Sequence, residues 1–163
     1  MTIRACEYFW DTSREVADRL ADRVRLVVPF EPDSNLICLA LNPVGNDAVA
    51  AANRFGRALF SRMKVDPERP VQAKTFIGSY TSLRKENLPG RQADRILDEL
   101  GLDPESYRSV PDDPAREADH LFILRHTLMN PWLLSDGGGG NYIDRYWSYL
   151  EELVDEVLQE DEW

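Results

Sequence analysis

Apolar residues recur along most of the chain, in some stretches at helical spacing and in others in continuous runs. Thr12-Ser13-Arg14-Glu15 matches a capping box, so we expect a helix to begin there. The apolar residues that follow recur every three or four positions and predict one packed helix face: Val16, Ala17, Leu20, Ala21 and Val24. The predicted organisation is an N-terminal linker helix over residues 1–23, followed by a single domain over residues 24–163.

Four later segments have the character of β-strands. Val24–Phe30 and Leu36–Leu41 flank the turn-forming stretch Glu31–Asn35, which predicts a hairpin. Leu36–Leu41 is apolar throughout, so both of its faces must be covered, as in a central strand. A third strand is expected within Thr75–Leu83, and a fourth begins at His120.

Three further helices lie between and after these strands. The first spans about residues 47–64, and Gly56 within it permits a close approach to the sheet at a helix-propensity cost of about 1 kcal/mol. The second, Arg91–Leu100, stops at the helix-ending glycine Gly101. The last follows Asn141, an expected N-cap.

Three other segments are expected to be irregular. Residues 103–119 are rich in proline and charge and read as a surface excursion. Gly137–Gly140 lacks the residues of a phosphate-binding loop and reads as a flexible hinge. The acidic residues Glu160–Glu162 suit a helix C-terminus poorly and should fray.

This order of elements predicts an α+β fold, with an antiparallel sheet of about four strands and helices packed mainly on one face. The runs Leu36–Leu41 and Leu121–Leu124 are apolar on both strand faces. If the helices lie on one side, little of the chain is left to cover the other. We therefore expect one sheet face to dock onto another domain or subunit.

The composition of the chain argues against several classes of function. The 163 residues carry 19 Lys and Arg against 29 Asp and Glu, and the net charge of −10 disfavours binding to nucleic acid or anionic membranes. No apolar run approaches the length of a membrane span. Cys6 and Cys38 lie in apolar contexts without metal or redox spacing, so we expect buried, reduced thiols in a cytoplasmic protein.

The stretch His120–Pro131 holds the strongest candidate for chemistry. Arg125 interrupts an apolar run, where an arginine is costly to desolvate unless an anion meets it. Its planar fork suits a carboxylate bound by two parallel hydrogen bonds. The alternatives are a structural ion pair, or a side chain that reaches solvent at the strand end. His126 shares a strand face with Leu124 and is interpreted as a core histidine.

Other chemistry finds little support in the residues. No His, Cys, Asp or Glu cluster has metal-ligand spacing, and no Gly-x-Ser-x-Gly elbow occurs. None of the three lysines, Lys64, Lys74 and Lys85, lies in an apolar setting that would favour a Schiff base. The residues alone thus indicate no metal site and no catalytic residue, and leave Arg125 as a candidate carboxylate binder.

Several motifs occur in an order that resembles a known family. They are Asn35–Pro43 followed by Gly45-Asn46 and a helix, Phe76–Leu83, Phe122–Arg125 with Asn130-Pro131 shortly after it, and a closing helix over Tyr142–Leu158. Over residues 12–158 the chain resembles the C-terminal domain of group II pyridoxal-phosphate-dependent amino acid decarboxylases, the glutamate decarboxylase-related group. That resemblance implies the small domain of a fold-type-I enzyme.

The resemblance also implies that the cofactor and Arg125 belong to two different domains. In that family the cofactor lysine follows a histidine in a large domain, and this sequence has no His-Lys pair. The chain would then be a C-terminal part, inactive alone, without covalently bound pyridoxal phosphate. It would pack on a large cofactor domain of the same protein or of a partner subunit, in a homodimer. Arg125 would bind the α-carboxylate of the amino acid substrate, whose identity stays open because residues 103–119 form a longer excursion than in the glutamate enzymes.

Two other functions compete with this one. The first is a non-catalytic α+β module that binds a ligand or dimerises through its open sheet face. The second is a self-contained hydrolase, for which the sequence offers no recognisable nucleophile–base pair.

Overall fold

The computed structural model describes residues 2–68, 70, 75–88, 91–107, 117–130, 132–135 and 140–160. Most of the predicted glycine hinge, residues 108–116 of the predicted excursion and residues 161–163 of the predicted frayed end lie outside the described residues. Within those ranges, no helix is both long enough and apolar enough to cross a lipid bilayer.

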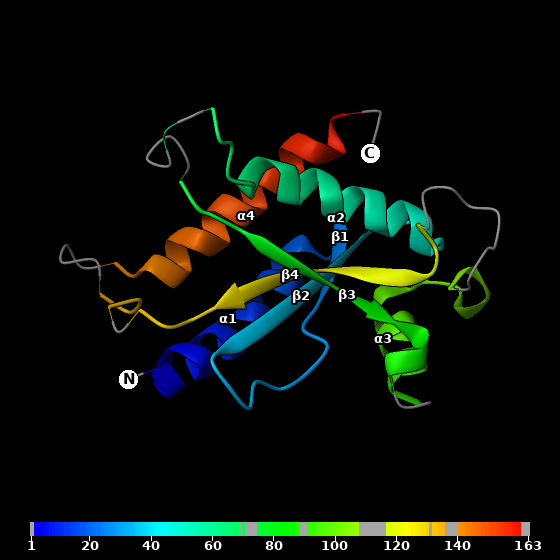
Figure 1. Cartoon of the computed structure of the whole chain (residues 1–163), viewed down its shortest axis with the longest axis horizontal. Helices are drawn as coiled ribbons and strands as arrows, with labels where there is room; N and C mark the ends of the chain where they lie inside the picture. Colours follow the sequence, from blue (N-terminus) through cyan, green and yellow to red (C-terminus); the bar gives the residue numbers. More distant parts are fainter. Residues whose placement is uncertain are drawn as a thin grey trace.

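The elements of the described chain follow the predicted order (Figure 1). They are α1 (Thr2–Leu20), β1 (Val24–Val27), β2 (Leu36–Pro43), α2 (Val49–Met63), β3 (Ser79–Arg84), α3 (Arg91–Leu100), β4 (His120–Thr127) and α4 (Tyr142–Leu158). Two short 3-10 helices, η2 (Lys85–Asn87) and η3 (Pro104–Ser106), flank α3. The predicted α+β class with a four-stranded antiparallel sheet is confirmed.

The sheet has the strand order β1-β2-β4-β3, and each neighbouring pair is antiparallel. The two strands predicted to be covered on both faces, β2 and β4, are the two central strands. Across the sheet, Arg125 on β4 pairs with Cys38 on β2 and with Ser79 on β3. These three side chains therefore project from the same sheet face, because directly paired residues point the same way.

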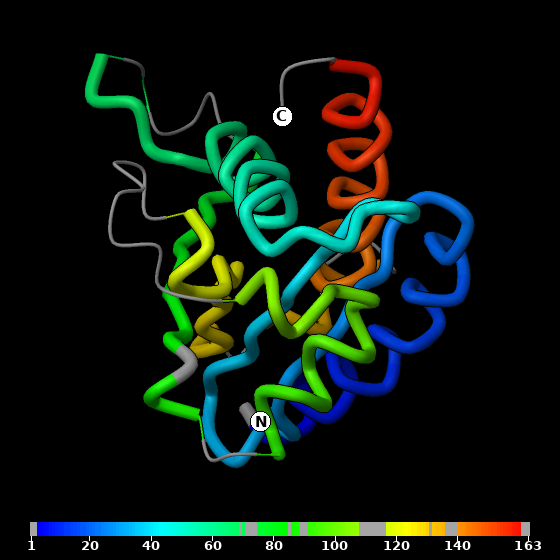
Figure 2. Tube along the Cα trace, turned by 90° about the vertical axis from the view of Figure 1, so that its right-hand side faces the viewer, coloured from blue at the N-terminus to red at the C-terminus, as the bar shows by residue number. Residues whose placement is uncertain are grey.

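Three helices cover one face of the sheet. Phe9 and Leu20 of α1, Leu59 of α2 and Leu150 of α4 are buried in one cluster with the strands. Figures 1 and 2 show α2 and α4 side by side above this face. The predicted packing of helices mainly on one face is thus confirmed.

The second face of the sheet is covered over half of its length, which the sequence analysis did not expect. Ile96 and Leu100 of α3, together with Tyr107 after η3, bury Ala40 and Ile123 of the central strands. The expectation that little of the chain is left to cover this face is therefore wrong for the part beneath α3, whereas docking of the face onto another domain or subunit stays a prediction. The other half stays open: Leu36 is 44% exposed there, and Arg125 beside it is exposed.

The first helix begins ten residues earlier than its capping-box motif predicted. Thr12 and Ser13 lie inside α1, where their hydroxyls donate to the carbonyls of Tyr8 at 2.7 Å and Trp10 at 2.6 Å. A serine or threonine inside a helix can donate its hydroxyl proton in this way to a backbone carbonyl of the preceding turn. The apolar residues Ala5 and Phe9 extend the helical stripe toward the N-terminus and bury α1 against the sheet.

Two other segments differ from the predictions in instructive ways. β3 starts at Ser79, and Phe76 before it packs on the aromatic rings of α4 instead of joining the sheet. The predicted surface excursion begins with the exposed residues 103–105, but its residue Tyr107 is fully buried and donates its hydroxyl proton to the Leu83 carbonyl. Gly101 adopts φ +68°, as expected of a glycine that ends a helix.

Candidate functional site

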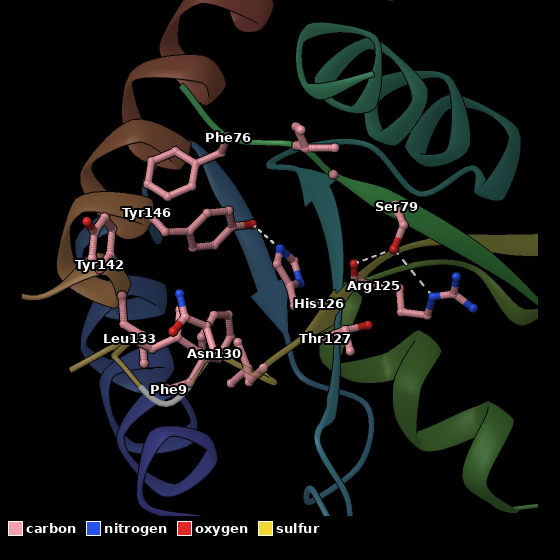
Figure 3. Close-up of a pocket in the computed structure, with 14 residues that line it drawn as sticks. Phe9, Phe76, Ser79, Arg125, His126, Thr127, Asn130, Leu133, Tyr142 and Tyr146 are labelled. Atoms are coloured by element: carbon pink, nitrogen blue, oxygen red, sulfur yellow. Dashed lines mark hydrogen bonds between the residues drawn. The ribbon is translucent and has the colours of Figure 1, made fainter. Parts of the chain in front are cut away.

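A pocket of about 420 Å³ lies where β4 ends and β3 begins (Figure 3). Its walls come from α1, from the start of α4 and from the loops beside the strands. The apolar lining residues are Phe9, Phe76, Ile77, Leu128, Leu133, Ile143 and Tyr146. An apolar concavity with a few converging polar groups is the usual form of a small-molecule site.

The start of α4, which forms one wall, is held by a cap and by α1. Asn141 caps the helix as predicted, and its side-chain oxygen accepts a hydrogen bond from the Asp144 amide at 2.8 Å. The Asp144 carboxylate accepts a hydrogen bond from the Tyr8 hydroxyl of α1 at 2.7 Å. This wall is therefore fixed by contacts between segments far apart in the sequence.

His126 and Tyr146 form the polar centre of the aromatic wall. His126 Nε2 lies 2.5 Å from Tyr146 Oη, and the Phe9 ring packs on both, with ring centroids 5.4 Å and 5.9 Å away. The predicted placement of His126 on the core face shared with Leu124 is confirmed. Only one ring nitrogen is satisfied, because the buried Nδ1 has no hydrogen-bond partner of ordinary geometry among the described residues.

Burial keeps both members of this pair uncharged. It lowers the pKa of His126 to about 4, an effect that a backbone interaction with Ile37 partly offsets. It also raises the pKa of Tyr146 well above its ordinary range. At neutral pH a protonated phenol thus faces a neutral imidazole, and the phenol can donate its proton to Nε2. The pair is a positioned hydrogen bond rather than a charged centre.

Arg125 lies beside the pocket in a different environment from the predicted one. Its side chain is exposed, because β4 here runs past the half of the second sheet face that α3 covers. Of the alternatives that the sequence left open, a side chain that reaches solvent describes the position of Arg125, whereas its role as a carboxylate binder stays a prediction. Across the described part of the chain, Arg125 has no ion-pair partner, so its charge is available to an anion.

Ser79 and Cys38 flank Arg125 on the neighbouring strands. Ser79 Oγ donates to the Arg125 carbonyl at 2.8 Å and accepts a hydrogen bond from Arg125 Nε at 3.3 Å. Burial raises the pKa of the Cys38 thiol, and the positive charge of Arg125 opposes that shift in part. Both neighbours have small side chains, and the Arg125 side chain is exposed between them.

The structure does not bring Arg125 and the His126–Tyr146 pair into one cluster. Consecutive residues of a strand point to opposite faces, and Figure 3 shows the guanidinium directed away from the aromatic pair. Arg125 and Ser79 nevertheless both line the pocket. The site therefore consists of an aromatic pocket with Ser79 and the exposed Arg125 at its rim, the guanidinium being directed away from the aromatic pair.

Only Lys64, of the three lysines, has a side chain that the structure describes. Lys64 directly follows α2 and is exposed, Lys74 lies outside the described residues, and the side chain of Lys85 is likewise not described. Within the same described ranges, no three His, Cys, Asp or Glu side chains converge as metal ligands. Cys6 and Cys38 are free thiols.

Sequence reasoning found Arg125 and His126 but missed their partners. Ser79 stands at the start of a strand that the pattern placed several residues too early. Tyr146 lies on the closing helix, in which the sequence analysis singled out no polar partner. A helical tyrosine on the same stripe as buried residues has a hydroxyl that needs a hydrogen-bond partner, and His126, on a strand whose apolar residues are buried, can provide one.

The family model described as tyrosine decarboxylase, C-terminal, matches residues 3–158. The match therefore covers nearly the whole chain, from the second residue of α1 to the last residue of α4. No curated protein matches the sequence.

Proposed function

Because the chain belongs to the family of tyrosine decarboxylase C-terminal domains, we propose that it completes the substrate site of a pyridoxal-phosphate-dependent amino acid decarboxylase. The observation that carries this proposal is the state of Arg125. It is exposed, it is held at Nε by Ser79, and it lacks an ion pair among the described residues. Such a guanidinium is prepared to bind a carboxylate from outside the domain.

The role proposed for Arg125 is to bind the α-carboxylate of the substrate. Two parallel hydrogen bonds would fix the plane of that group as well as its position. Orientation matters in a decarboxylation, because the bond to the carboxylate has to break in line with the system that receives its electrons. Arg125 would therefore act as a substrate-positioning residue.

The electron sink of such a reaction is pyridoxal phosphate, which the residues described in this chain do not fit. Lys64 is exposed at a helix end and lies outside the aromatic pocket. We therefore propose that a large domain, in the same protein or in a partner subunit, holds the cofactor. The chain alone would then be inactive, and the complete enzyme would be a cytoplasmic homodimer related to the group II decarboxylases.

Tyrosine is the first substrate to test. The family is described by its action on tyrosine, and the pocket beside Arg125 has the aromatic lining that suits a ring. The test is to combine the chain with its cofactor domain and measure amine release from L-tyrosine, L-phenylalanine and L-glutamate. Tyramine as the principal product supports the proposal, whereas an enzyme that contains cofactor and releases no amine from any amino acid contradicts it.

The pocket also favours a second candidate, a non-catalytic module that binds a ligand or dimerises. Met129 is 67% exposed and Trp132 64% exposed on the loop that follows β4, and Ile77 on the pocket wall is 55% exposed. Exposed apolar groups around a concavity are typical of binding sites. A large domain with a His-Lys pair, in the same reading frame or in a subunit that co-purifies with the chain, would favour the decarboxylase, and the absence of both would favour the binding module.

A further inference from the structure

We infer that Ser79 is the positioning residue of Arg125, an inference that rests on the proposed carboxylate-binding role of that arginine. The two residues are directly paired between β3 and β4. A single hydroxyl contacts Arg125 twice, at its carbonyl oxygen and at Nε. Ser79 thereby ties the side chain of Arg125 to the backbone of the same residue.

The donor and acceptor capacity of a serine hydroxyl decides which part of the guanidinium stays free. The hydroxyl has one proton, which Ser79 donates to the Arg125 carbonyl at 2.8 Å. Its lone pairs accept the Nε proton at 3.3 Å. The edge of the Arg125 guanidinium that contains Nε is therefore occupied by the Ser79 hydroxyl. A carboxylate is expected to bind end-on, across the two terminal nitrogens Nη1 and Nη2.

The position of Ser79 is itself fixed by the contact of its neighbour Gly78 with the end of α2. Gly78 donates its backbone N–H to the carbonyl of Met63, the last residue of α2, at 3.1 Å. A Cβ at position 78 would lie 2.9 Å from the Cβ of Met63, so the chain approaches α2 as closely as glycine allows. The end of α2 thus sets where β3 starts, and the start of β3 sets the direction of Arg125.

The alternative is that the Ser79 hydroxyl only strengthens the pairing of two strands. These roles predict different results for three substitutions. Ser79→Ala removes both hydrogen bonds, and Ser79→Thr keeps the hydroxyl on a residue that favours strands. Ser82→Ala is the matched control, because Ser82 lies on the same strand and points to the opposite face.

The first readout is nuclear magnetic resonance of the arginine Nε–H group in the 163-residue chain. In Ser79→Ala, the Nε proton of Arg125 is expected to exchange with water about 5-fold faster or more, as expected for a lost hydrogen bond. Ser79→Thr should restore the slower exchange, and Ser82→Ala should not alter it. Unchanged exchange in a folded Ser79→Ala chain would show that Ser79 does not hold Nε.

The second readout is the kinetics of the complete decarboxylase. Ser79→Ala is expected to raise KM for the amino acid about 3- to 10-fold with kcat within about twofold, since it loosens binding and not the chemical step. Ser79→Thr should return KM to the wild-type value. Normal KM in Ser79→Ala, in an enzyme that Arg125→Ala impairs, overturns the positioning role alone. Unchanged kinetics in Arg125→Ala would instead overturn the proposed function.

Discussion

Tyr146 Oη on α4 and His126 Nε2 on β4 lie 2.5 Å apart and join the last helix to the central strand. Tyr146→Phe would keep the ring and leave the imidazole nitrogen without its partner. We expect this substitution to lower the free energy of unfolding by about 1–2 kcal/mol, the cost of a buried group left unsatisfied. Urea denaturation of the chain measures it. Tyr149→Phe, one helical turn along α4, serves as the control and should cost less.

The buried state of His126 predicts how stability depends on pH. The unfolded histidine takes up a proton as the pH falls through about 6.5, whereas the folded one stays neutral down to a pKa of about 4. The contribution of neutral His126 to the free energy of unfolding is therefore complete above pH 6.5. It is lost as the pH falls toward 4, and the loss is on the order of 3 kcal/mol.

This dependence is measured by repeating the denaturation between pH 4 and pH 7. His126→Gln retains a group that can hydrogen-bond but does not titrate, so its stability should fall less across the same interval. The control is Tyr149→Phe on α4, which leaves both histidines in place and should keep the shape of the wild-type curve. Parallel curves for His126→Gln and the wild type would contradict a buried neutral imidazole.

Gly56 shows that the close packing predicted from the sequence is real. A Cβ at this position of α2 would lie 2.9 Å from the Cδ1 atom of Phe122, whose ring stacks on Tyr80. Gly56→Ala improves helix propensity by about 1 kcal/mol, yet we expect a net loss of about 1–2 kcal/mol because overpacking outweighs that gain.

The matched experiment places Gly56→Ala in a Phe122→Leu background. The smaller side chain relieves the contact, so the same alanine should there be neutral or stabilising. An equal loss of stability in both backgrounds, measured by thermal unfolding, would mean that Phe122 is not the obstacle.

The sequence predicted the order of the elements well, because each helix and strand carries its own apolar pattern. Central strands such as Leu36–Leu41 were identified because both their faces are apolar. Positions where a local signal competes with tertiary packing were predicted less well. The capping-box motif at Thr12 was overridden by Ala5 and Phe9, which bury the preceding turns of α1.

The candidate site was predicted less completely than the fold for a related reason. Arg125 stands in an apolar run, yet its exposure depends on where α3 ends on the far face of the sheet. Its partner Ser79 is 46 residues away in sequence and is specified only by strand register. No pattern within either segment carries that register, so the pairing of Arg125 with Ser79 required the structure.

The most direct test of the account is kcat/KM of the complete decarboxylase with alanine or lysine at position 125. We expect Arg125→Ala to lower kcat/KM by about 30- to 150-fold, which corresponds to about 2–3 kcal/mol for a lost charged hydrogen-bond pair. The kcat/KM of Arg125→Lys should lie between those of Arg125→Ala and the wild type, since lysine keeps the positive charge but lacks the planar guanidinium. Arg84→Ala, an exposed arginine on β3, should leave activity unchanged. Equal kcat/KM in Arg125→Ala and the wild type would contradict the claim that this guanidinium binds the substrate carboxylate.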